Sequence, residues 1–139
     1  MSQSDDHWAI TDTLCRYARC LDLFDFEGVG SVFSDDADIE YGGYPVFHGG
    51  AEAVAFLQEH TARTSWQQHM VSVVDIQLDG DVANTVTYFI AHAVPKDDAD
   101  QVRTSVGEYR DRLQRTPDGW QIVERRQQTG WKETRRRAS

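Results

Sequence analysis

The stretch Gln68–Val94, QHMVSVVDIQLDGDVANTVTYFIAHAV, decides the fold class of this 139-residue chain. Apolar and polar side chains alternate over much of it on both sides of the segment Asp79–Asp81, which is typical of two antiparallel strands joined by a hairpin turn. Two further strands are predicted downstream, at Gln101–Thr116 and Trp120–Trp131, separated by a Pro-Asp-Gly turn. The second half of the chain is therefore predicted to be an antiparallel meander.

The first half of the chain has helical rather than alternating spacing. Three helices are predicted, at Asp5–Leu21, Phe26–Phe33 and Ala51–Arg63, with a short strand at Ala37–Gly43. Helices followed by an antiparallel meander indicate an α+β fold. A strongly curved sheet wrapped against three helices would form a cone-shaped α+β barrel that encloses a pocket. We expect one domain over residues 1–132 and a disordered basic tail over residues 133–139.

Composition limits the classes of function open to this chain. The net charge of −9 disfavours a nucleic-acid-binding protein, and a hydrophobic content of 40% indicates a globular fold rather than a disordered chain. No apolar run approaches the ~20 residues of a membrane span, and the polar start MSQSDDHW is unlike a signal peptide. We therefore expect a cytoplasmic protein without nucleic-acid or membrane partners, with Cys15 and Cys20 reduced.

Two acids, Asp22 and Asp25, follow the first predicted helix, and only one has an evident local role. Asp25 is placed to cap the second helix, whereas Asp22 lies beside the apolar stripe at the end of the first. Asp22 is either a solvated helix-end carboxylate or a carboxylate drawn inward that needs a partner. His69 is the candidate partner, in phase with Val71 and Val73 at the start of a strand, although a histidine there can also be an ordinary core residue.

An Asp–His pair would form an acid–base unit. A carboxylate that accepts a hydrogen bond from one ring nitrogen fixes the imidazole tautomer and leaves the other nitrogen free as a base near neutral pH. The sequence itself does not place Asp22 beside His69, because 46 positions separate them.

Several stretches of the sequence resemble a known family. They are RYARCLDLFDFEGVGSVFSDDADIEYGG (residues 16–43), QQHMVSVV (67–74), YFIAHA (88–93) and DGWQIVERR (118–126). Together they are similar to the SnoaL-like branch of the nuclear transport factor 2-like superfamily, which includes scytalone dehydratase, hexachlorocyclohexane dehydrochlorinase and bile-acid dehydratase. The resemblance extends to about Trp131 and implies the same cone-shaped fold.

The resemblance also implies roles for individual residues. Asp22 and His69 match the Asp–His pair of these dehydratases in order and local context. Tyr17 and Tyr41 match positions that carry pocket side chains in relatives, and His92 falls about where relatives have another polar pocket residue.

Further pocket residues are expected on the later strands. Arg125 or Arg126 resembles an arginine in the last strand of some members; the choice between them stays open, and Arg125 is the working choice. Most aromatic residues of these strands are expected in the core or at a subunit interface, with Trp66 and Tyr88 at the pocket mouth.

These residues predict a cofactor-independent lyase, most simply a dehydratase acting on a compact apolar cyclic or steroid-like molecule. His69 would remove a proton from a carbon next to a carbonyl, and Asp22 would orient His69. Tyr17 or Tyr41 would stabilise the developing oxyanion or assist the leaving hydroxide. A double-bond isomerase or a polyketide cyclase would use the same groups. A non-catalytic ligand-binding protein, similar to the small subunit of a ring-hydroxylating dioxygenase, is the alternative from another class.

We expect no cofactor and no metal. Asp22, His69 and His92 lack the close H-x-H or H-x-x-x-H spacing that is typical of a metal site. The aromatic and branched surface of the later strands predicts a homo-oligomer, and the resemblance favours a trimer over a dimer.

Overall fold

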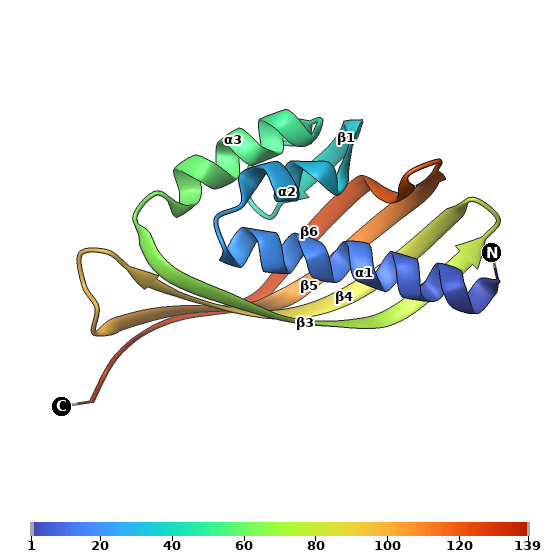
Figure 1. The fold of residues 1–139 in the computed structure, drawn as a ribbon. Coiled ribbons are helices and arrows are strands. Elements are labelled where there is room, and N and C mark those ends of the chain that lie inside the picture. Colours follow the sequence, from blue (N-terminus) through green and yellow to red (C-terminus); the bar gives the residue numbers. More distant parts are fainter. Residues whose placement is uncertain (1, 139) are drawn as a thin grey trace.

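Three helices lie on one face of a six-stranded sheet in the computed structural model, which describes residues 2–138 (Figure 1). The helices are α1 (Gln3–Asp22), α2 (Phe26–Ser31) and α3 (Gly50–Thr61). The strands are β1 (Phe33–Tyr41), β2 (Phe47–His48), β3 (Thr64–Asp79), β4 (Val82–Pro95), β5 (Gln101–Thr116) and β6 (Gly119–Arg136). The order of helices and strands along the chain confirms the α+β prediction.

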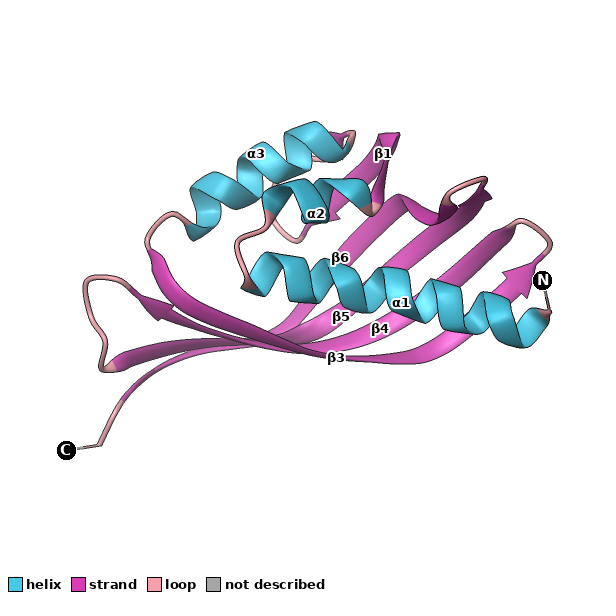
Figure 2. Ribbon diagram, in the orientation of Figure 1, coloured by secondary structure: helices cyan, strands magenta, loops and turns pink. Residues whose placement is uncertain are grey.

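The sheet is curved and open, with the strand order β2-β1-β6-β5-β4-β3. All neighbours pair antiparallel except β1 and β6, which run parallel and bring the first strand beside the last. Figure 2 shows the four long strands, β3 to β6, as bent ribbons with the helices on one side. The concave face of the sheet thus packs on three helices, as the predicted cone requires.

Helix α1 begins earlier than its apolar spacing predicts, because a capping box starts it. Ser2 Oγ accepts a hydrogen bond from the Asp5 N–H (3.1 Å), and the Asp5 carboxylate accepts one from the Ser2 N–H (3.1 Å). Ile10, Leu14 and Leu21 are buried on the face that packs on the sheet. Packing of this face brings the end of α1 into contact with the start of β3, and the candidate site lies at that contact.

Strand β6 extends further than the sequence indicates. The expected tail begins at residue 133, yet Glu133 pairs with Thr104 of β5, and the ladder continues to the pair of Gln101 with Arg136. An ion pair between Arg136 and Asp98 (2.8 Å) holds the end of the strand. Only residues 137 and 138 follow β6 among those that the structure describes; Ser139, part of the expected tail, lies outside them.

The convex face of the sheet is not covered by a helix and carries several large apolar side chains. Met70, Ile90, Val106 and Trp131 lie in one row across β3, β4, β5 and β6. Met70 is 61% exposed and Trp131 53%. Within residues 2–138, no helix has the length and apolar character needed to cross a membrane.

Candidate active site

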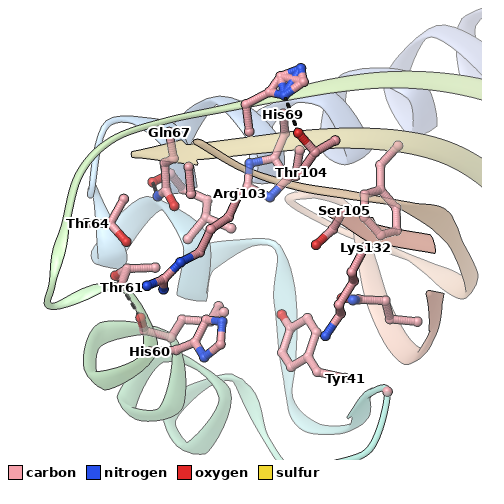
Figure 3. Close-up of a pocket in the computed structure, with 18 of the residues that line it drawn as sticks. Tyr41, His60, Thr61, Thr64, Gln67, His69, Arg103, Thr104, Ser105 and Lys132 are labelled. Carbon is pink, nitrogen blue, oxygen red and sulfur yellow. Dashed lines mark hydrogen bonds between the residues drawn. The ribbon is translucent and has the colours of Figure 1, made fainter. Parts of the chain in front are cut away.

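A cavity of about 340 Å³ lies between α3, the end of α1 and the concave face of the sheet (Figure 3). We call its buried part the inner end, which is lined by Tyr17, Leu21, Tyr41, Phe89 and Tyr109. We call its exposed part the mouth, which is lined by His60, Arg103, Lys132 and Thr134. The inner end is aromatic, whereas the mouth is polar and basic.

Asp22 and His69 are in direct contact at the junction of α1 and β3. Asp22 Oδ1 is 2.7 Å from Nδ1 of the His69 ring, and Asp22 Oδ2 accepts a hydrogen bond from the His69 backbone N–H (2.9 Å). The side chains are 11% and 13% exposed, respectively. His69 lines the cavity, whereas Asp22 lies behind the ring and does not line it. One carboxylate therefore fixes both the backbone and the ring of the histidine.

This contact determines which nitrogen of His69 can act as a base. An ionised carboxylate only accepts hydrogen bonds, so Nδ1 donates to Asp22 and carries the ring proton of the neutral imidazole. Nε2 is then unprotonated, and within residues 2–138 it has no hydrogen-bond partner. The arrangement presents a free basic nitrogen to the cavity.

The local sequence explains why the end of α1 presents Asp22 to β3. The Phe24 N–H donates to the Leu21 carbonyl (3.0 Å) and the Asp25 N–H to the Cys20 carbonyl (2.9 Å), which together form a Schellman turn. Phe24 occupies the left-handed position of this turn with a φ of 57°, where glycine is usual. Asp25 then caps α2 by accepting from the Gly28 N–H. The tight turn ends α1 at Asp22.

Strand β3 holds the helix end through a second side chain, which the sequence did not reveal. Gln67 Nε2 donates to the Leu21 carbonyl (2.6 Å), one of the helix-end acceptors that lack an intrahelical partner. Gln67 is buried and lines the cavity two residues before His69. Its position in phase with His69 was the available signal.

Tyr17 and Tyr41 form a phenol pair at the inner end. Their hydroxyl oxygens are 2.7 Å apart, and either can donate to the other. Both rings are buried and both line the cavity. Burial raises the pKa of Tyr17 and raises that of Tyr41 well above its usual value, so both phenols keep their protons at neutral pH. The pair can therefore donate a hydrogen bond to a ligand oxygen.

Arg125 lies beneath this pair and not in the cavity. Its side chain is 1% exposed and binds Asp111 through two hydrogen bonds, of 2.8 and 2.9 Å. The guanidinium carbon is 4.1 Å from the centre of the Tyr17 ring and 4.0 Å from that of Tyr109. Burial acts to lower the Arg125 pKa, but the charge and hydrogen bonds of Asp111 outweigh it and raise the pKa well above its usual value. Arg126 instead pairs with Glu40 (3.3 Å) at the surface.

The side chains of the remaining expected pocket residues lie on the convex face of the sheet. Trp66 and Tyr88 do not line the cavity; they are 50% and 55% exposed and alternate with cavity residues along their strands. The structure therefore places both on the convex face rather than at the mouth. On β4, His92 is in phase with Tyr88 and Ile90, and its Nδ1 is 3.3 Å from Thr104 Oγ1. The residue borders the cavity, but its ring lies on the convex face, contrary to the expectation that it would be a pocket side chain.

The mouth contains residues that sequence reasoning missed. Arg103, Ser105 and Lys132 extend from β5 and β6, and His60 extends from the end of α3. Burial and the nearby charges of Lys132 and Arg103 lower the pKa of His60. Among residues 2–138, no three His, Cys, Asp or Glu side chains are grouped so that they could hold a metal ion.

Known proteins with this sequence pattern and fold include both named enzymes and uncharacterized proteins. The uncharacterized protein Rv2910c from Mycobacterium tuberculosis is 27% identical over 126 residues, covering 90% of this chain and 86% of that protein. A candidate aromatic ring hydroxylase from Novosphingobium aromaticivorans has a similar structure (TM-score 0.84, 25% identity), with 97% of this chain and 96% of that chain covered.

Two further solved structures share the fold at lower identity. A candidate scytalone dehydratase from Novosphingobium aromaticivorans has a TM-score of 0.84 at 18% identity, covering 91% of this chain and 85% of that chain. The hexachlorocyclohexane dehydrochlorinase LinA-type3 from Novosphingobium barchaimii has a TM-score of 0.84 at 14% identity, covering 95% and 91%. The model of the SnoaL-like domain matches residues 2–126, so this chain belongs to the SnoaL-like family.

Proposed function

We propose that this protein is a cofactor-independent lyase that catalyses a dehydratase-type elimination on a small cyclic molecule. The observation that carries the proposal is the 2.7 Å contact between Asp22 and His69 Nδ1, which leaves Nε2 unpaired toward a cavity. A base held in one tautomer beside an enclosed space is suited to removing a proton from carbon. The cavity volume of about 340 Å³ suits a compact ligand.

The proposed reaction begins with proton transfer from carbon to His69. The substrate is a β-hydroxy carbonyl compound; Nε2 takes the proton next to the carbonyl, and the C–H electron pair forms an enolate. The enolate then forms the carbon–carbon double bond as the β C–O bond breaks. The leaving oxygen takes a proton from the imidazolium of His69 and departs as water. The products are an unsaturated carbonyl compound and water, and His69 returns to its starting state.

The phenol pair would stabilise the enolate oxygen. Tyr17 and Tyr41 are 2.7 Å apart, so one hydroxyl can donate to the other while the second donates to the substrate. Fixed donors aimed at a developing negative charge contribute roughly 10²–10³ in rate. Arg125 is too deeply buried to contact substrate, and it would act by holding the Tyr17 ring.

The comparisons support an elimination over other acid–base reactions. Two of the similar structures are named as a candidate dehydratase and a dehydrochlorinase. Loss of water and loss of hydrogen chloride both start with removal of a proton from carbon, which a His69 base would perform. An isomerase would return that proton to a different carbon and would release no water.

The proposal can be tested with a panel of cyclic β-hydroxy ketones. Formation of a conjugated enone is followed by its ultraviolet absorbance in the wild-type protein and in His69→Ala. We expect His69→Ala to reduce turnover by roughly 10²–10⁴-fold with an unchanged circular dichroism spectrum. Near-normal turnover by His69→Ala would overturn the role of His69. A panel without turnover would favour a ligand-binding role.

The chain offers a matched control for this test. His48 and Asp38 form a second His–Asp pair (2.8 Å), but His48 is exposed and does not line the cavity. His48→Ala removes the same chemical group from the same kind of contact. We expect it to leave turnover unchanged.

We also propose that the chain forms a homo-oligomer, with a trimer favoured, through the convex face of the sheet. Met70, Tyr88, Ile90 and Trp131 are large apolar side chains exposed on that face. Burying such a patch between copies removes apolar surface from water. Multi-angle light scattering should show an oligomer, and Tyr88→Lys should dissociate it; a monomer at all working concentrations would contradict the proposal.

A further inference from the structure

The cavity mouth contains two cations that the proposed elimination does not use. Arg103 extends from β5 and Lys132 from β6, and both side chains point into the cavity (Figure 3). Both residues are exposed, so an incoming molecule can contact them. Their function has to be sought in recognition rather than in proton transfer.

Strand register fixes the position of these cations relative to His69. His69 pairs with Ala91, Ala91 with Ser105, and Ser105 with Lys132, so one row crosses the concave face from the base to the ammonium group. Arg103 lies in the next row on the same face, because it pairs with Ala93. Neighbouring strands are about 4.8 Å apart, so the Cα atoms of His69 and Lys132 are separated by roughly 14 Å along the sheet.

Neither cation has an acidic partner among residues 2–138. Every other basic residue of β5 and β6 is in an ion pair with a carboxylate: Arg110, Arg112, Arg115, Arg125, Arg126, Arg135 and Arg136. The nearby Glu133 is itself held by Arg135 at 3.1 Å. In a chain with a net charge of −9, two unpaired cations on neighbouring strands at one cavity mouth are well placed to meet an anion from outside the chain.

Hydroxyl groups complete the donor set at the mouth. Ser105 pairs with Lys132, and Thr134 pairs with Arg103, so each cation has a hydroxyl-bearing neighbour on the adjacent strand. A guanidinium fork, an ammonium group and hydroxyl donors together match the oxygens of a carboxylate or a phosphate. A neutral apolar molecule would make no use of these four donors, which would stay hydrated.

We propose that the substrate carries an anionic group, a carboxylate or a phosphate, which Arg103 and Lys132 bind at the mouth. The ring system then extends inward, so that its reacting carbon lies at His69. The inference rests on the proposed function only for the position of that carbon; binding of the anion does not need turnover. The substrate is thus amphiphilic rather than wholly apolar.

Calorimetric titration of the wild-type protein with three probes of one shape tests the charge requirement. The probes are 2-naphthoate, 2-naphthyl phosphate and the neutral 2-naphthamide. We expect at least one of the anions to bind more tightly than the amide, and its Kd to increase with added salt while that of the amide does not. Preference for 2-naphthoate would identify a carboxylate, and preference for the phosphate ester a phosphate.

Three variants locate the contact. Arg103→Gln and Lys132→Gln should each raise the Kd of the preferred anion by about threefold to tenfold and leave the amide unchanged. Lys96→Gln removes the same charge from the turn between β4 and β5, outside the cavity, and should change neither. Equal affinity for anions and amide, no measurable binding of either anion, or equal effects of all three variants would overturn the inference.

A fourth variant separates this inference from the proposed function. His69→Ala should retain the affinity for the preferred anion, because the anion contacts are made by other residues. An anion preference that depends on Arg103 in a protein without lyase activity would uphold the anion site and reject the elimination. Turnover without any anion preference would uphold the elimination and reject the anion site.

Discussion

The inner end and the mouth of the cavity differ in how their polar groups are held. The Tyr17–Tyr41 contact at the inner end and the Asp22–His69 contact at the α1–β3 junction are both 2.7 Å and largely or fully buried. At the mouth, Arg103 and Lys132 are exposed and unpaired within residues 2–138. Groups that must act on a transition state gain from being fixed beforehand, because no reorganisation is then needed during the reaction. Groups that recognise a ligand can stay hydrated until it arrives.

The largest expected effect on activity comes from substitution of Asp22. In Asp22→Asn the side-chain oxygen can still accept from the His69 backbone, but the amide can donate to Nδ1 and so hold the wrong tautomer. We expect kcat/KM to fall roughly 10²–10⁴-fold. The Asp22→Asn/His69→Ala double variant should be little worse than His69→Ala alone, because the two residues act as one unit. Losses that multiply would contradict that coupling.

The second largest effect is expected at the buried Asp111–Arg125 ion pair beneath the inner end, and it concerns stability rather than rate. Asp111→Ala leaves the buried charge of Arg125 unpaired, and removal of one partner from a buried ion pair lowers the free energy of unfolding by about 3–5 kcal/mol. Urea denaturation measures this as a shift in midpoint at constant slope. Glu124→Ala, which breaks the partly exposed pairs with Arg112 and Arg126, should change the free energy by no more than ~1 kcal/mol. Similar losses in both variants would show that burial is not the cause.

Removal of one phenol should have a smaller effect on rate. Tyr41→Phe leaves Tyr17 as the one donor of the pair, so we expect kcat to fall by up to roughly 10²-fold. Because burial raises the pKa of both phenols, their ionisation should not reduce activity on the alkaline side below about pH 10. A loss of wild-type activity between pH 8 and pH 9 that disappears in Tyr41→Phe would contradict the assignment of a protonated donor.

The smallest expected effect is a pH dependence at the mouth. Lys132 and Arg103 face His60 from β6 and β5, while Tyr44 and Phe56 pack against its ring; burial and the two cations lower its pKa. A bound anion offsets those charges and raises the pKa, so binding takes up a proton. The affinity for the preferred naphthyl anion should rise about twofold to fivefold from pH 7.5 to pH 5.5, after allowance for ionisation of the ligand.

His60→Gln should remove most of that pH dependence, which calorimetry at several pH values can measure. Protonation of His60 has the opposite effect on the stability of the free protein. Because the folded pKa of His60 lies below the unfolded value of 6.5, the unfolded state takes up the proton first and stability falls as the pH drops through that value. Affinity and stability should therefore change in opposite directions on acidification, and parallel changes would contradict this account.

The fold and the Asp22–His69 contact were accessible from the sequence for different reasons. Alternation over Gln68–Val94 predicted the strands directly, because the period of two follows from the pleat. Asp22 stood out since Asp25 already capped the next helix, and resemblance to a known family supplied its partner. The contact across 47 positions could not be derived from local pattern alone.

Strand register was the part of the structure that could not be predicted correctly from the sequence. Strand β6 contains two irregularities against β5, between the partners of Arg112 and Leu113 and between those of Val106 and Gly107. Side chains along β6 therefore do not alternate regularly between the two faces of the sheet. Arg125 and Lys132 share the concave face although they are seven residues apart. The choice between Arg125 and Arg126, and the face on which Lys132 lies, depend on these irregularities. Trp66 and Tyr88 were misplaced because their face follows only from their cavity-lining neighbours.

The hydrogen bond between the His69 backbone N–H and Asp22 also bears on aggregation. β3 is an edge strand that pairs with β4 alone, and unpaired edge amides can recruit strands from other molecules. Asp22 Oδ2 occupies one such amide. Asp22→Ala would uncover it, whereas Asp22→Asn can keep an acceptor there. The two variants should thus lose activity alike but differ in solubility, because the carboxylate also protects the open edge of the sheet from strand addition.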